Sequence, residues 1–334
     1  MHTTRLVLAF GALTISGWAQ PSAGVAGPVT GFIFDAQAGA VRPMLGIPGA
    51  AYLGNGVGSG LDAAAVAPDG SAALAVQQRG GKLVLYTGLR NARPASSVVA
   101  GAIAGPDQFA WTANGSAAAV YSSRAGQGQM LTGLGQSPVA GAPIDLSSLS
   151  GQVTAMAFDG ERLILAVASA DAGGIYLASA AAGVQRIASA VSPSAIALAG
   201  SSLFFSDSQS QQIFQVQNYA RTPGVVVFAN DSGINSPVGL QVSVDGQRLF
   251  VANAGNRKLA VYDIASRAPV ESVDLAFKPT CLDLFGDPSV FLMNSSGQGP
   301  LYVVRDGGPG KAAAVYFVPA PPHSRPLKAP IRPT

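Results

Sequence analysis

The fold is decided by residues 236–263, which read SPVGLQVSVDGQRLFVANAGNRKLAVYD. Apolar runs stand before and after Asp245-Gly246, and an Asp-Gly pair favours the positive φ angles that a tight hairpin turn requires. Two more apolar runs with strand-like alternation follow further along the chain. The stretch therefore predicts a unit of four antiparallel strands. These strands are 238–244, 248–252, 258–264 and 270–275.

The turn of this unit recurs along the chain at intervals of 40 to 46 residues. Its glycines are Gly70, Gly115, Gly160, Gly200, Gly246 and Gly286. Four-stranded units repeated at this spacing are typical of β-propeller blades. No long apolar stripe at helical spacing is found, so the chain is predicted to be an all-β propeller of four-stranded antiparallel blades.

The number of blades follows from counting units. Six units fit between residues 61 and 320, and a partial unit precedes them. In the partial unit, residues 31–36 and 41–47 align with the third and fourth strands of a repeat, and 50–53 is a candidate for one more. Seven blades are predicted, with six blades and an N-terminal hairpin as the alternative. Because an open ring would expose strand edges, we expect residues 313–318 to pack in or directly beside the blade that contains 31–36.

Residues 236–263 also carry a family resemblance. A Pro-led strand, an Asp-Gly turn, a Leu-Phe-Val-Ala-Asn strand and a Val-Tyr-Asp strand follow one another there. In this order the stretch resembles the YVTN/NHL-type β-propeller repeats of secreted bacterial proteins, and residues 203–216 form a looser copy. The resemblance extends over about residues 31–320 and implies the propeller fold. It implies no single activity, since members of the family bind proteins, polysaccharides, lipids or small molecules, and a few related propellers are hydrolases or lyases.

The first 19 residues have the three parts of a secretory signal peptide. Arg5 precedes a short apolar stretch, and Gly17 and Ala19 provide small residues at a cleavage site. The apolar stretch is shorter than the roughly 20 residues of a membrane span. We therefore expect a secreted or periplasmic protein without a transmembrane segment after cleavage; an uncleaved anchor is the alternative.

The rest of the chain divides into one folded domain and a tail. Residues 20–320 are predicted to form a single propeller, and residues 321–334 a Pro-rich disordered segment. The tail carries Arg325, Lys328 and Arg332, so its alternative role is weak tethering to an anionic surface.

Composition limits the functions open to the chain. The formal net charge is +3 and only 11% of the 334 residues are charged. No clustered basic patch is found, so nucleic-acid binding is not expected. Cys281 is the sole cysteine, which excludes a disulfide within the chain and a Cys-cluster zinc site. We interpret Cys281 as a buried small hydrophobe rather than a reactive thiol.

The two histidines are His2 and His323, in the predicted signal peptide and in the tail. A folded body without histidine cannot hold a Ser-His-Asp triad, a His-ligated zinc or a histidine general base. We therefore favour a protein that is not an enzyme and predict no catalytic residue, no metal ligand and no cofactor. Carboxylates stay open for acid–base chemistry or Ca²⁺, but five of them suit structural roles as acceptors in turns or at third-strand ends. These five are Asp69, Asp159, Asp245, Asp35 and Asp263.

The predicted ligand site is the face of the propeller where the loops between second and third strands meet the loops between blades. Its polar residues are rich in amides and poor in acids: Arg79, Arg124, Gln209, Gln211, Asn253, Asn256, Arg257 and Lys278. The predicted function is an exported, non-catalytic binding or scaffold module for a protein or a glycan. A carboxylate- or Ca²⁺-dependent propeller hydrolase or lactonase is the alternative, which three or more carboxylates converging at the channel mouth would favour.

Overall fold

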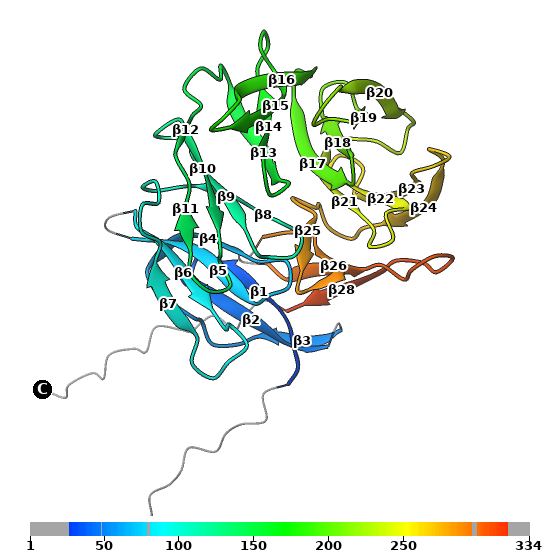
Figure 1. Ribbon diagram of the computed structural model, residues 1–334. Helices are drawn as coiled ribbons and strands as arrows, with labels where there is room; N and C mark the ends of the chain where they lie inside the picture. The colour runs from blue at the N-terminus through cyan, green and yellow to red at the C-terminus, as the bar shows by residue number, and fades with distance from the viewer. Residues whose placement is uncertain (1–26, 48, 79–80, 296–298, 320–334) are drawn as a thin grey trace, which may run out of the picture.

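The computed structural model describes residues 27–47, 49–78, 81–295 and 299–319. These residues form 28 strands in seven antiparallel sheets and no helix. Figure 1 shows the sheets, called blades 1 to 7 in chain order, standing in a ring around a common centre. The protein is a seven-bladed β-propeller, so the predicted fold class is confirmed and the six-bladed alternative is wrong. The described part of the chain has no helix long and apolar enough to span a membrane.

The strands are distributed over the blades as follows. Blade 1 holds β1 (Val29–Asp35), β2 (Ala40–Ile47) and β3 (Ala50–Leu53); blade 2 holds β4 (Leu61–Val66), β5 (Ala72–Gln77), β6 (Leu83–Thr87) and β7 (Ala95–Val98). Blade 3 holds β8 (Gln108–Trp111), β9 (Ala118–Ser122), β10 (Gln127–Thr132), β11 (Val139–Ala140) and β12 (Ile144–Asp145); blade 4 holds β13 (Gln152–Phe158), β14 (Leu163–Ala168), β15 (Gly174–Ser179) and β16 (Gly183–Ser189). Blade 5 holds β17 (Pro193–Ala199), β18 (Ser202–Asp207), β19 (Gln212–Gln217) and β20 (Gly224–Ala229); blade 6 holds β21 (Pro237–Val242), β22 (Arg248–Asn253), β23 (Lys258–Asp263) and β24 (Pro269–Asp274). Blade 7 holds β25 (Asp283–Phe285), β26 (Asp287–Leu292), β27 (Leu301–Arg305) and β28 (Ala314–Val318).

The ring has two different ends. In blades 2 to 7 the first strand is innermost and each strand pairs with the one before it, except that β11 and β12 both pair with β10. One end, the turn face, carries the turns between first and second strands and those between third and fourth strands. There Ile264 N donates a hydrogen bond to Gln247 O. The other end, the loop face, carries the connections between second and third strands and those between blades. There Leu275 N donates a hydrogen bond to Arg257 O at 2.8 Å.

Blade 1 departs from the predicted alignment. The β1 strand begins at the turn face, where Thr30 lies against Gly286 in the first turn of blade 7. It ends at the loop face, where Gly39 O accepts a hydrogen bond from Leu61 N at the start of β4. This is the direction of a second strand, because first and third strands run from the loop face to the turn face.

The side chain of Asp35 supports the same assignment. Its carboxylate accepts hydrogen bonds from two backbone N–H groups of the following turn, as Asp207 does at the end of the second strand of blade 5. Strands β1, β2 and β3 therefore take the second, third and fourth positions. The prediction that residues 31–36 and 41–47 are third and fourth strands, with Asp35 at a third-strand end, is wrong.

The ring closes by the packing of blade 7 on blade 1. The β28 strand lies beside β3 (Figure 1), but the two belong to different sheets. Buried side chains of both blades form one apolar cluster, which includes Ile33, Met44, Phe285, Leu301 and Val318. The prediction that residues 313–318 pack directly beside the first blade is confirmed.

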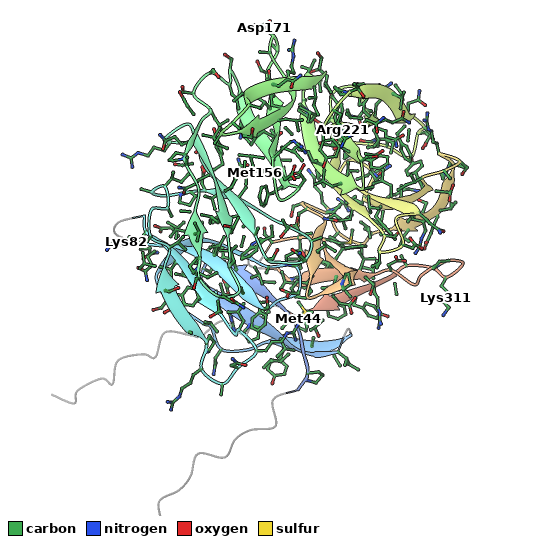
Figure 2. All side chains as sticks on the ribbon, in the orientation of Figure 1. Met44, Lys82, Met156, Asp171, Arg221 and Lys311 are labelled. Atoms are coloured by element: carbon green, nitrogen blue, oxygen red, sulfur yellow. The ribbon has the colours of Figure 1, made fainter. Side chains whose placement is uncertain are left out.

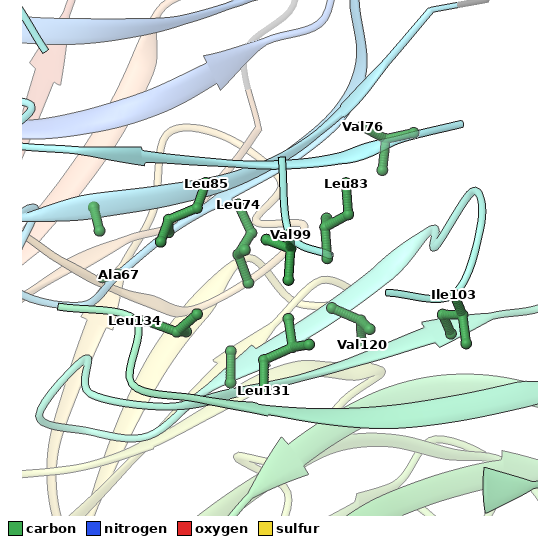
Figure 3. Packing of buried hydrophobic residues seen from close by; sticks show 12 residues of the cluster. Ala67, Leu74, Val76, Leu83, Leu85, Val99, Ile103, Val120, Leu131 and Leu134 are labelled. Carbon is green, nitrogen blue, oxygen red and sulfur yellow. The ribbon is translucent and has the colours of Figure 1, made fainter. Parts of the chain in front are cut away.

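Neighbouring blades are held together by apolar side chains. Figure 3 shows the cluster between blades 2 and 3, in which Leu74 and Leu85 pack with Val120 and Leu131. All four are almost completely inaccessible to water. Burial of side chains of this size stabilises the fold by about 1.5–3 kcal/mol each, so the packing between sheets accounts for the rigid ring.

Inner strands are also joined by side-chain hydrogen bonds near the loop face. Gln108 Nε2 donates to Val153 O at 2.8 Å, Thr154 Oγ1 to Pro193 O at 2.6 Å, and Ser194 Oγ to Pro237 O at 2.6 Å. Thr154 and Ser194 are the extra residues of β-bulges, where the register with the second strand shifts. Each bulge thus turns a hydroxyl group towards the next blade.

Replacing Thr154 by Val is expected to lower the free energy of unfolding by about 1–3 kcal/mol, because it keeps the shape of the side chain and removes the donor to Pro193 O. Urea denaturation measures the change. Ser210→Ala is the control, since Ser210 is exposed at the loop face and should change stability by less than about 0.5 kcal/mol. Equal stability of Thr154→Val and the parent protein would contradict this role of the bulge.

Candidate functional site

The predicted binding residues gather on the loop face where the structure describes them. Arg124, Gln209, Arg257 and Lys278 are exposed there, while Gln211 and Asn256 are half-buried. Arg79 lies outside the described residues. That this set binds a ligand stays a prediction.

Asn253 is a different case, because its side chain is completely buried. Its Oδ1 accepts a hydrogen bond from Asn235 N at 3.0 Å and its Nδ2 donates to Val251 O at 3.2 Å. Asp207 fixes the equivalent loop of blade 5 by accepting from Val191 N at 2.9 Å. Asn253 therefore stabilises the connection between blades 5 and 6 from a buried position, and its side chain is not exposed on the loop face.

Gln211 and Asn256 hold the connection between blades 5 and 6. Gln211 Oε1 accepts from Ser236 N and its Nε2 donates to Ser208 O, both at 2.6 Å. Asn256 Nδ2 donates to Gly233 O at 3.1 Å, while its buried Oδ1 has no hydrogen-bond partner among the described residues. These hydrogen bonds join the turns of both blades to residues 230–236 and hold the backbone of this sector of the loop face in one conformation.

One backbone position distinguishes blades 5 and 6 from blades 1 to 3. The last residue of the turn between second and third strands has a positive φ in five blades: Gly39 at 56°, Gly81 at 59°, Gly126 at 61°, Gln211 at 57° and Arg257 at 54°. Glycine adopts this conformation freely, whereas other residues are destabilised in it by about 1–2 kcal/mol. The hydrogen bonds of the Gln211 side chain offset the free-energy cost of its positive φ. Arg257 is exposed, and no described residue forms a hydrogen bond or ion pair with its guanidinium.

A second candidate site is a cavity of about 530 Å³ in the channel. Its lining is mostly apolar and comes from the inner strands, including Phe109, Met156 and Ile196; Figure 2 labels Met156 on the inner side of blade 4. The cavity reaches the turn face, where Pro68 belongs to its lining. Asp283 is the one carboxylate among the described residues that line it.

The titratable side chains of the cavity, Asp283 and Cys281, lie in β25 of blade 7 and just before it. The side chain of Asp283 is accessible to water from the channel. The protein atoms packed around its carboxyl group nevertheless desolvate it in part, which raises the pKa of this group above the ordinary value. Burial, followed by the charge of Asp283, raises the pKa of the Cys281 thiol far above its usual range. A protonated thiol is a weak nucleophile. Cys281 is half-buried and precedes β25, so the structure places it on the cavity wall rather than inside a strand.

The turn carboxylates have structural roles. Asp69, Asp159 and Asp245 each accept a hydrogen bond from the backbone N–H two residues further on. Such contacts stabilise the tight turn, as the sequence predicts. Across the described ranges, no three His, Cys, Asp or Glu side chains gather where they could hold a metal ion.

Comparisons with known proteins support the fold alone. The chain is similar to a functionally unknown protein from Desulfotomaculum acetoxidans DSM 771, with 14% identity and a TM-score of 0.58 over 88% of this chain and 100% of that chain. It is also similar to streptogramin B lyase (14%, TM-score 0.55, 82% and 85%) and to a chain of a nidogen/laminin complex (12%, TM-score 0.50, 73% and 93%). No protein-family model and no curated protein matches the sequence. At such low identities the likeness shows the β-propeller fold and no activity.

Proposed function

We propose that this propeller is an exported, non-catalytic binding module of the YVTN/NHL repeat type, whose loop face recognises an acidic protein. The observation that carries the proposal is Arg257. It keeps a large cationic side chain at a backbone position with φ of 54°, where three other blades have glycine. Residues are retained in such conformations where the surrounding structure and function require them.

The charges around Arg257 support an anionic partner. Lys278 lies three residues beyond Leu275, whose N–H is bonded to Arg257 O, so both cations belong to one sector of the loop face. The carboxylates of this sector are already engaged: Asp274 pairs with Lys258 at 3.2 Å, and Asp231 accepts from the Tyr262 hydroxyl at 2.9 Å. The guanidinium of an arginine binds a carboxylate through two parallel hydrogen bonds.

The shape of the face favours a protein over a small molecule. Small ligands are bound in concave, mainly apolar pockets, and neither Arg257 nor Lys278 belongs to the lining of the cavity described above. The cations and the exposed Gln209 are instead distributed over the loops of blades 5 to 7. A partner that contacts several loops at once needs an extended surface, as proteins have. Among the described residues that line the cavity, Asp283 is the one carboxylate, whereas the hydrolase alternative calls for three or more.

The proposal predicts that the mature protein binds poly-L-glutamate and that Arg257→Glu combined with Lys278→Glu weakens this binding at least about tenfold, or 1.4 kcal/mol. A biosensor titration at two salt concentrations measures the affinity, which should fall with salt. Arg221→Glu combined with Arg267→Glu is the matched control, because it changes the net charge equally and both arginines are exposed in turns between third and fourth strands, at the turn face. Equal loss in both variants, or preferential binding of polygalacturonate, would overturn recognition of an acidic protein by the loop face.

A further inference from the structure

The cavity in the channel combines an apolar lining with a single charged residue. Inner strands of blades 3, 4 and 5 line it with side chains such as Phe109, Met156 and Ile196. Asp283 is the one acidic residue of this lining, and no Lys, Arg or His is found among the described residues that form it. The one charge that the described lining can present to a ligand is therefore negative.

We propose that this cavity binds a small amine with an apolar body, whose ammonium group pairs with the Asp283 carboxylate while its body contacts the inner strands. The cavity would be a second binding site, separate from the cations of the loop face. The proposal does not depend on the acidic protein proposed above, because neither Arg257 nor Lys278 belongs to the cavity lining.

The position of Asp283 gives the cavity a polar end and an apolar end. Asp283 pairs with Leu292, the last residue of β26, whereas Phe285 pairs with Asp287 at the first turn of blade 7. First strands run from the loop face to the turn face, so Trp111 at the end of β8 also lies towards the turn face. A ligand can therefore place its charged group near Asp283 and extend its apolar part towards the turn face.

The volume and the lining suit a small organic molecule. The cavity measures about 530 Å³, and ligand pockets have volumes of about 300–1,000 Å³. Phe109, Trp111, Met156 and Ile196 are all only partly buried, so apolar surface is in contact with water inside the channel. An apolar ligand removes this surface from water, which favours binding. Aromatic rings in the lining also attract a cation to their faces.

Charge complementarity selects an amine among apolar ligands. No ion pair joins Asp283 to an Arg or Lys of the described residues. Its polar neighbour is the thiol of Cys281, an uncharged and weak donor, and the Gln241 amide is already engaged, since its Nε2 donates to Leu282 O at 3.0 Å. A carboxylate that protein partly desolvates is unfavourable in its ionised form unless a cation accompanies it, in agreement with the raised pKa of Asp283. An ammonium group supplies this cation.

Trp111 provides a built-in probe, because it lines the cavity and is the sole tryptophan of residues 20–334. Titration of the mature protein with phenylbutylamine is expected to change the Trp111 fluorescence in a saturable way. Phenylbutylamine should bind at least about tenfold more tightly than phenylbutanol, which has the same apolar body and no charge. Phenylpentanoate, which carries a negative charge on the same body, should bind more weakly than phenylbutanol.

Asp283→Asn is expected to bind phenylbutylamine as weakly as phenylbutanol, and to leave the affinity for phenylbutanol within about twofold of the parent protein. Asp171→Asn is the matched control, because it removes the same charge from an exposed residue at the tip of blade 4, which Figure 2 labels away from the channel. It should bind all three probes like the parent protein.

The comparison of the three probes needs no variant, so it decides the matter even if Asp283→Asn folds poorly. Absence of saturable phenylbutylamine binding, or equal affinities of the parent protein for phenylbutylamine and phenylbutanol, would overturn the proposal. So would an unchanged affinity of folded Asp283→Asn for phenylbutylamine. None of these results concerns poly-L-glutamate, so the outcome is independent of recognition at the loop face.

Discussion

Replacing Gly286 by alanine is expected to lower the free energy of unfolding by about 3 kcal/mol or more, whereas the same change at Gly246 should lower it by about 1 kcal/mol. The two glycines occupy the first turns of blades 7 and 6, with φ of 69° and 70°, so the backbone strain is the same. A Cβ atom at Gly246 would meet nothing within 4 Å. At Gly286 it would collide with backbone atoms of Thr30 and Gly31 in blade 1. Backbone cannot move aside as a flexible side chain can, so blades 7 and 1 must separate.

The difference between the two variants measures the ring closure alone, because the shared strain cancels. Urea denaturation of each purified variant gives the two free energies, and an unchanged m-value confirms that the native and unfolded states are comparable. If Gly286→Ala and Gly246→Ala lose equal stability, the contact between the first turn of blade 7 and the start of β1 does not hold the ring together.

Local patterns in the sequence predicted most of the fold. The strands of blade 6 were expected at 238–244, 248–252, 258–264 and 270–275, and they occur at Pro237–Val242, Arg248–Asn253, Lys258–Asp263 and Pro269–Asp274. Tight turns and alternation are properties of neighbouring residues, so one sequence is enough to recognise them. The packing of blade 7 beside blade 1 followed from the need to protect strand edges.

The position of β1 within its blade could not be obtained in this way. The alignment of the repeats matched Asp35 to Asp263, at the end of a third strand, where an acceptor for N–H groups of the following turn is useful. Both carboxylates do accept such hydrogen bonds. Asp207, at the end of a second strand, forms such bonds too. The motif therefore identifies a strand that ends in a turn but not its order in the blade. Only the direction of β1 relative to blades 2 and 7 distinguishes the two positions.

The positions of the candidate residues, as distinct from their function, were predictable in part. The loop face and its exposed cations follow from the order of strands, but the burial of Asn253 does not. The recurrence of Asp or Asn at the ends of second strands, as in Asp35 and Asp207, is the signal that would have revealed its structural role. The place of Asp283 in the cavity depends on where seven inner strands meet, which no local pattern describes. The positive φ of Arg257 could be predicted only by aligning its turn with the turns that end in glycine.

Replacing Arg257 by glycine is expected to raise stability while it weakens the proposed binding of an acidic protein. Glycine relieves the positive φ of 54°, and the larger freedom of glycine in the unfolded chain offsets part of this gain, which leaves a net increase of about 0.5–1 kcal/mol. The loss of the guanidinium should weaken the binding of poly-L-glutamate at least about tenfold. Opposite changes in stability and affinity are the sign of a residue kept for function at the expense of the fold.

Arg267→Gly is the matched control for this prediction. Arg267 is also an exposed arginine with a positive φ, of 60°, but it lies at the turn face between β23 and β24. Its replacement removes the same charge and relieves the same kind of strain, so it should raise stability by a similar amount and leave poly-L-glutamate binding within about twofold of the parent protein. Thermal unfolding and the biosensor titration measure both quantities on the same preparations. If Arg257→Gly binds as tightly as Arg267→Gly, the strained arginine of the loop face is not a binding residue, because net charge and backbone relief are equal in the two variants.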